Sequence, residues 1–232
     1  MKSLRFLSGL FFAVVLAGSQ AKAHDIVDVW VGGVFIPVGF DDNDEIVVGL
    51  DGFLPNSCHQ LLTPTVVRED NVFKVALKAS VSPPPCLIPS LIPFSKIVTI
   101  GQLGAGDYSV EANGGLAFEN LHVELAPAGT QDTFTYAAVE GASIDRSGGI
   151  LTAVVYAKLI DTCTTIKEVK IFDHVKTIEV LPIVARVDNG NCQPDDAVKQ
   201  IRAELPATVG DGRHLLHVRS VGGQSVNLMF SR

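Results

Sequence analysis

The chain has 232 residues, of which 47% are hydrophobic, and a formal net charge of −7. An acidic chain repels phosphate backbones and does not favour anionic lipid, so we expect no nucleic-acid partner and no basic lipid-binding patch. No apolar run approaches the roughly 18 residues that a membrane-spanning helix needs, so we also expect no transmembrane segment.

The N-terminal residues are typical of a processing signal. Lys2 and Arg5 precede a mostly apolar run at 6–17, and Ala21-Lys22-Ala23 fits an A-x-A cleavage site. We therefore predict a signal peptide at 1–23. The protein would be exported to the periplasm or the extracellular space, with a bacterium as the favoured source.

Cleavage after Ala23 would make His24 the first residue, and a free amine beside an imidazole can chelate copper. At this one position the chain resembles periplasmic copper-carrier β-sandwiches and copper-dependent polysaccharide oxygenases. A further ligand would come from His59, His122 or His174. The chain has only two Met, and a polar residue after a cleavage site needs no metal, so we expect no cofactor.

Hydrophobic residues recur with a period of two, which predicts β-strands. At 72–80, one face carries Phe73, Val75, Leu77 and Ala79. The segment 195–205 has helical spacing, but a strand, or one helical turn leading into a strand, is favoured. Other expected strands are rich in Val, Ile and Thr and are separated by turn residues; they lie at 26–31, 108–110, 116–123, 150–159, 169–172, 178–187, 215–221 and 226–230.

Two polar clusters interrupt this pattern. The acidic run 41–45 offers oxygen ligands but lacks the spacing of an EF-hand, so a solvated turn between strands is favoured over calcium. The cluster 188–191 is interpreted as a hairpin turn.

The four cysteines indicate an internal repeat. Cys58 and Cys86 are separated by nearly the same number of residues as Cys163 and Cys192, and the flanking sequences are loosely similar. In an exported chain an even number of cysteines favours disulfides. The repeat predicts the pairs Cys58–Cys86 and Cys163–Cys192, one in each of two related domains.

The segment 82–94 (SPPPCLIPSLIPF) is the main candidate for partner binding. Its five prolines exclude a central strand, and Leu87, Ile88, Leu91 and Ile92 make it apolar. A rigid loop attached through Cys86 would lose little entropy on binding a protein or a glycan. The alternative is that these side chains cap the core, and we expect Leu87 and Ile88 to be buried and the other two to be more exposed.

Leu103 to Val110 (LGAGDYSV) resembles the tyrosine corner of immunoglobulin-like and fibronectin type III domains. The resemblance implies that the Tyr108 hydroxyl bonds to upstream backbone. In the second half Leu216 stands at the corresponding place, so that corner lacks the hydroxyl. More broadly, the chain is similar to uncharacterised secreted bacterial proteins built from tandem immunoglobulin-like modules, which implies no reaction.

Together these features predict an all-β chain of two tandem immunoglobulin-like sandwiches, at 24–126 and 133–232, each with one disulfide. No G-x-S-x-G, H-E-x-x-H or phosphate-binding motif occurs, so we expect no enzymatic activity. The favoured function is an exported binding or structural protein. The alternatives are a periplasmic copper protein based on His24 and a protease inhibitor acting through the loop 82–94.

Overall fold

The computed structural model describes residues 25–115, 117–128, 132, 134–188 and 190–232. These residues form β-strands and two short 3₁₀ turns, η1 (Ser147–Gly149) and η2 (Val221–Gly223), and contain no α-helix. In this described part of the chain no helix has the length and apolar character needed to cross a membrane. The all-β prediction is confirmed, whereas the signal peptide at 1–23 and His24 lie outside the described residues.

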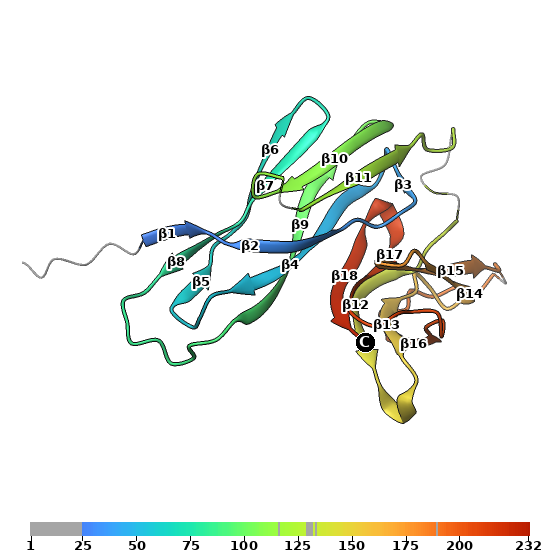
Figure 1. The fold of residues 1–232 in the computed structure, drawn as a ribbon. Helices are drawn as coiled ribbons and strands as arrows, with labels where there is room; N and C mark the ends of the chain where they lie inside the picture. Colours follow the sequence, from blue (N-terminus) through green and yellow to red (C-terminus); the bar gives the residue numbers. More distant parts are fainter. Residues whose placement is uncertain (1–24, 116, 129–131, 133, 189) are drawn as a thin grey trace, which may run out of the picture.

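Residues 25–124, here called the first half, form three sheets (Figure 1). One sheet has the order β1 (Asp25–Asp28), β8 (Lys78–Val81), β5 (His59–Leu61). A second has the order β3 (Phe40–Asp41), β11 (Ala117–Glu124), β10 (Gly106–Ala112), β7 (Val72–Ala76), β6 (Thr65–Glu69). The third has the order β2 (Trp30–Phe35), β4 (Glu45–Leu54), β9 (Ile92–Gln102). All three sheets contribute apolar side chains to one core.

Residues 138–231, here called the second half, form two sheets around a separate core. One has the order β12 (Ala138–Asp145), β13 (Thr152–Lys158), β16 (Val198–Glu204). The other has the order β14 (Thr164–Asp173), β15 (Thr177–Arg186), β17 (Arg213–Arg219), β18 (Ser225–Ser231). The preference for a strand at 195–205 is therefore confirmed by β16. Among the described strands none pairs across the two halves, while the predicted boundaries at 126 and 133 stay predictions.

The expected apolar face at 72–80 is confirmed, but the run is divided between two sheets. All four apolar residues are buried, and the chain passes from β7 to β8 at Leu77. A similar break between β1 and β2 occurs at Val29. The Asn113 side chain joins the two breaks: its Oδ1 accepts the Leu77 N–H (2.7 Å), and its Nδ2 donates to the carbonyls of Leu77 (2.9 Å) and Val29. One amide thus satisfies backbone groups where both strands change sheets.

The hairpin turn expected at 188–191 is wrong. Within the described residues, the strands on either side of this segment, β15 and β16, belong to different sheets, so the segment is part of a connection between them. Asp188 Oδ1 accepts the Gly190 N–H at 2.8 Å, and Gly190 has a φ of 81°. The Asp188 side chain therefore makes a local contact with backbone, but the polar composition did not indicate that the next strand, β16, lies in the other sheet.

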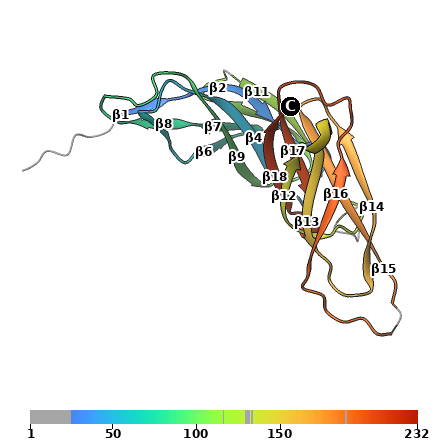
Figure 2. The ribbon, with the colours of Figure 1, turned by 90° about the horizontal axis from the view of Figure 1, so that it is seen from below.

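The two halves meet at an angle, with β17 and β18 beside β4 (Figures 1 and 2). A Cβ atom at Gly49 of β4 would lie 2.7 Å from Met229 Sδ and 3.6 Å from Leu215 Cδ1. A side chain at this position would require the Met229 side chain to move, so the glycine lets β18 pack close to this strand. The Phe40 and His217 rings also meet across the contact, with centroids 5.3 Å apart.

Candidate binding surfaces

The predicted disulfides are confirmed. Cys58 bonds to Cys86 and Cys163 to Cys192, with Cα–Cα distances of 5.2 and 5.3 Å. The first closes the loop between β8 and β9 onto the connection that follows β4. The second joins the residue before β14 to the connection between β15 and β16.

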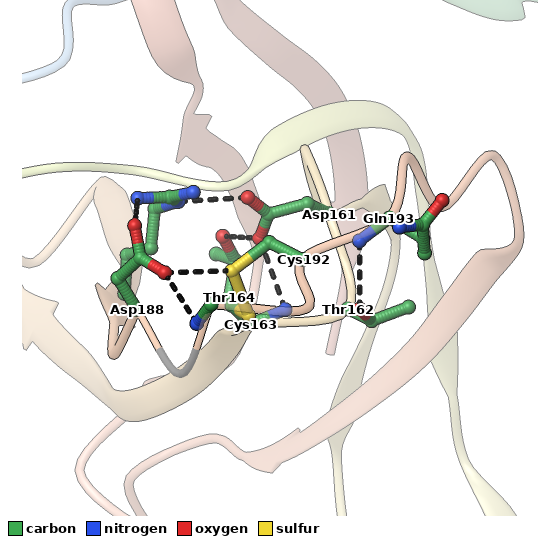
Figure 3. Close-up of a disulfide and its surroundings, with 9 residues drawn as sticks. Asp161, Thr162, Cys163, Thr164, Asp188, Cys192 and Gln193 are labelled. Carbon is green, nitrogen blue, oxygen red and sulfur yellow. Dashed lines mark hydrogen bonds and ion pairs between the residues drawn. A yellow bond between two sulfur atoms is a disulfide. The ribbon is translucent and has the colours of Figure 1, made fainter.

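Figure 3 shows that Asp161 organises the second disulfide. Its Oδ1 accepts hydrogen bonds from the Cys163 N–H (3.1 Å) and Thr164 Oγ1 (2.7 Å), and its Oδ2 accepts one from Arg186 Nε (2.7 Å). The Thr164 hydrogen bond and then the Arg186 pairing hold the pKa of Asp161 below its usual value. Asp161 therefore has a structural role: it fixes the backbone at Cys163 and connects it to Arg186.

The Pro-rich loop is largely exposed. The expectation that Leu87 and Ile88 would be buried is wrong, whereas the expected exposure of Leu91 is confirmed. Leu87, Ile88 and Leu91 are 93%, 51% and 66% exposed. Ile92, expected to be more exposed, packs against the core of the first half and pairs with Leu54 as the first residue of β9.

Hydrogen bonding explains why the residues next to Cys86 are not buried. The Ser57 N–H donates to the Ile88 carbonyl (3.0 Å), and the Ile88 N–H donates to Ser57 Oγ (2.8 Å). These bonds fasten the loop to the connection after β4, outside the core. The disulfide therefore holds a backbone segment in place without drawing the Leu87 side chain inward.

A buried charge cluster joins the two halves around Arg219. Its guanidinium donates to the Gly39 carbonyl and forms an ion pair with Asp44, both in the first half. Asp132 Oδ1 lies 3.5 Å from Arg219 Nη2, and Glu179 Oε1 lies 3.9 Å from Nη1. One cation thus faces three carboxylates, each at most 10% exposed as a side chain.

Burial dominates the protonation of this cluster. Desolvation raises the pKa of Glu179 to about 7 and that of Asp132 to about 6, and the nearby Arg219 only partly offsets this. Desolvation also raises the pKa of Asp44, despite its ion pair. His174 Nε2 lies 3.8 Å from Glu179 Oε2, and this buried atom has no hydrogen-bond partner among the described residues.

Sequence reasoning missed this cluster. The acidic run 41–45 does form a turn between β3 and β4, as expected, but it is not fully solvated: Asp44 is 3% and Asp41 9% exposed. The one available signal was Arg219, a charged residue inside the predicted strand 215–221. Nothing in the sequence indicated which residue would neutralise it.

The second half contains a cavity of about 630 Å³ at one end, between the ends of β13 and β15. Its walls are mostly apolar, with Tyr136, Leu159 and Val184 among the lining residues. The cations at its rim are engaged, since Lys158 Nζ lies 2.5 Å from Glu140 and Arg186 pairs with Asp161. The volume is within the range of small-molecule sites, and Asp195 and Asp196 add carboxylates to the lining, but nothing in the described residues indicates a particular ligand.

The proposed copper ligands have separate environments. His59 Nδ1 lies 2.8 Å from Asn56 Oδ1, His122 Nδ1 lies 2.6 Å from Asp107 Oδ1, and His174 faces Glu179. The described residues contain no group of three or more His, Cys, Asp or Glu side chains arranged to hold a metal ion. His24 lies outside them, so the copper alternative gains no support.

One comparison with known proteins bears on the first half. Residues 48–123 match the model of the ORF11 beta-sandwich domain family, a region that runs from β4 to β11 and includes Cys58, Cys86 and Tyr108. No curated protein and no solved structure matches the chain. The match covers less than half of the chain and, with the all-β structure, identifies a β-sandwich protein.

Proposed function

We propose that this is an exported, non-enzymatic binding protein whose Pro-rich loop contacts a partner protein. One observation carries the proposal: Leu87, Ile88 and Leu91 are exposed on a loop that is tied down by a disulfide and by Ser57. Exposed aliphatic side chains in one place are a liability unless they have a partner. A loop that is already ordered loses little entropy on binding.

The chemistry of the loop favours a protein with an apolar cleft as the partner. No charged residue occurs between Lys78 and Lys96, and prolines remove backbone donors at several positions. An exported protease is one partner of this kind, and in that case the loop would act as an inhibitor. The two disulfides support a location outside the cytoplasm.

The test is cross-linking of the purified full chain to an envelope fraction, comparing the wild type with a Leu87→Ser/Leu91→Ser variant. Both replaced residues are more than 60% exposed, so the variant should fold with an unchanged melting midpoint. We expect one dominant cross-linked partner that binds the wild type and binds the variant at least tenfold more weakly. A panel of exported proteases tests the inhibitor version directly.

Val187→Ser is the matched control. Val187 is 71% exposed but lies in the second half, so this variant should retain the partner. A partner that binds the wild type and the loop variant equally well would exclude the loop as the binding surface, even if the protein is a binding protein.

A further inference from the structure

A second surface of the first half carries aromatic rather than aliphatic side chains. Trp30 of β2 and Phe53 of β4 are register partners, and their nearly parallel rings have centroids 5.7 Å apart and an interplanar angle of 25°. They are 53% and 39% exposed. Pro93 of β9, the partner of Phe53 on the other side, is exposed too. With strands about 4.8 Å apart, the three rings form a row about 10 Å wide.

The position of Trp30 is set by the backbone beneath it. The strand has an irregularity at Gly32, where the register shifts between Val31 and Gly33. A Cβ atom at Gly32 would lie only 2.7 Å from Cη2 and 2.8 Å from Cζ3 of the indole. The ring therefore rests on the Gly32 backbone and beside Phe53, and it is held in place before any ligand arrives.

Polar groups lie next to this row of three rings on the same face of the sheet. Asp51 and Ser95 are register partners two residues along from Phe53 and Pro93, about 6.6 Å farther along the strands. Arg213 of the second half reaches this row, with its Nη1 3.4 Å from Ser95 Oγ. Its charge also acts on Asp51. A carboxylate, a hydroxyl and a guanidinium thus border the rings.

We infer that this surface, made by Trp30, Phe53, Asp51, Ser95 and Arg213, binds a neutral glycan. A sugar ring has a flat face of C–H groups, which suits the electron-rich face of an aromatic ring, and an edge of hydroxyl groups. The carboxylate and guanidinium can form charge-assisted hydrogen bonds with those hydroxyls. The charges near the site balance: Arg213 and Lys176 both act on Asp51, and Lys176 forms an ion pair with Glu119, so the site suits an uncharged ligand.

This inference goes beyond the proposed function, because it uses different side chains from the loop. A nucleic acid would need excess positive charge, which the chain lacks. A glycan explains why ordered aromatic rings and a hydrogen-bonding row occur side by side.

The chain contains a single Trp, so the intrinsic fluorescence of Trp30 reports directly on the site. The purified full chain is titrated with cellohexaose, chitohexaose, laminarihexaose and maltohexaose, and is also applied to an array of neutral polysaccharides. We expect a saturable change in emission with at least one of these sugars. The affinity for the same sugar should fall at least tenfold in Phe53→Ser and in Trp30→Ala. For Trp30→Ala, which lacks the fluorescent residue, the affinity is measured by calorimetry.

Two controls define the surface. Phe118→Ser removes another exposed phenylalanine, 64% exposed on β11, and should leave glycan affinity unchanged. Leu87→Ser should also leave it unchanged, which separates failure of this inference from failure of the loop proposal. Asp51→Asn should weaken binding while the variant keeps its melting midpoint. The inference would be overturned if the protein bound none of the neutral sugars, or if binding survived Trp30→Ala. It would also be overturned if Trp30→Ala abolished binding to a protein partner but not to a sugar.

Discussion

Arg219 of β17 and Asp44 of the turn before β4 form a buried ion pair that joins the two halves of the molecule. Their side chains are 8% and 4% exposed. Removing either partner of a buried ion pair destabilises the folded protein strongly, because the remaining charge is buried without compensation. The contact between the halves therefore requires both charges of the pair, one from each half.

We predict that Arg219→Gln lowers the free energy of unfolding of the full chain by about 3 kcal/mol. The variant leaves Asp44, Asp132 and Glu179 close together without their cation. Arg202→Gln is the matched control, because Arg202 is half exposed and pairs with Asp145 on the surface, and it should change stability by less than about 1 kcal/mol. Denaturant melts measure both, and equal losses would contradict a special role for the buried site.

The stability of the cluster should depend on pH through Glu179. Its pKa in the folded protein, about 7, is above its ordinary value of 4.5, chiefly because it is buried. Between these values the unfolded state binds fewer protons than the folded state, so the free energy of unfolding falls as pH rises from 4.5 to 7. Asp132, with a pKa raised to about 6, acts in the same direction.

Glu179→Gln isolates this effect. His217, whose pKa is lowered to about 4 by burial, acts in the opposite direction between pH 4 and 6.5, so the profile of the wild type alone is not diagnostic. We predict that the wild type loses up to roughly 3 kcal/mol relative to Glu179→Gln between pH 4.5 and pH 8. Parallel pH profiles of the two proteins in denaturant melts would show that Glu179 keeps its ordinary protonation behaviour.

Tyr108 makes the hydrogen bond that its motif implied: its hydroxyl donates to the Gly104 carbonyl at 2.9 Å. We predict that Tyr108→Phe lowers the free energy of unfolding by about 1 kcal/mol, the usual net contribution of one such bond. The ring contacts with Phe73 and Arg68 are retained by phenylalanine. Tyr156→Phe, on β13 of the second half, is the control, and an unchanged midpoint and slope for Tyr108→Phe would count against the bond.

The features that could be predicted from the sequence are those that depend on local patterns of residues. Period-two hydrophobicity indicated many of the strands, though not β4, β6 or β12, and the repeated cysteine spacing predicted both disulfides. The resemblance to the tyrosine corner implied a bond from Tyr108 to upstream backbone, and the structure has it at Gly104. In each case the residues that interact are close in the chain or stand in a repeated arrangement.

Contacts between distant segments were not predictable in the same way. Asn113 bonds to Leu77 and Val29 because two strands change sheets at the same point, which no local pattern records. Asp44 is buried where it pairs with Arg219, which lies 175 residues away in the chain. Trp30 and Phe53 became a candidate site only when register placed them side by side.

The Pro-rich loop provides the last prediction, because its aliphatic residues have opposite environments. Ile92 packs against the core of the first half, so Ile92→Ser should lower the free energy of unfolding by about 2 kcal/mol, through lost packing and an added hydroxyl. Leu87 is 93% exposed, and Leu87→Ser should change stability by no more than about 0.5 kcal/mol. Denaturant melts of the two single variants make the comparison. Equal, large destabilisation by both would mean that the loop caps the core in solution, and the exposed aliphatic surface on which partner binding depends would not exist.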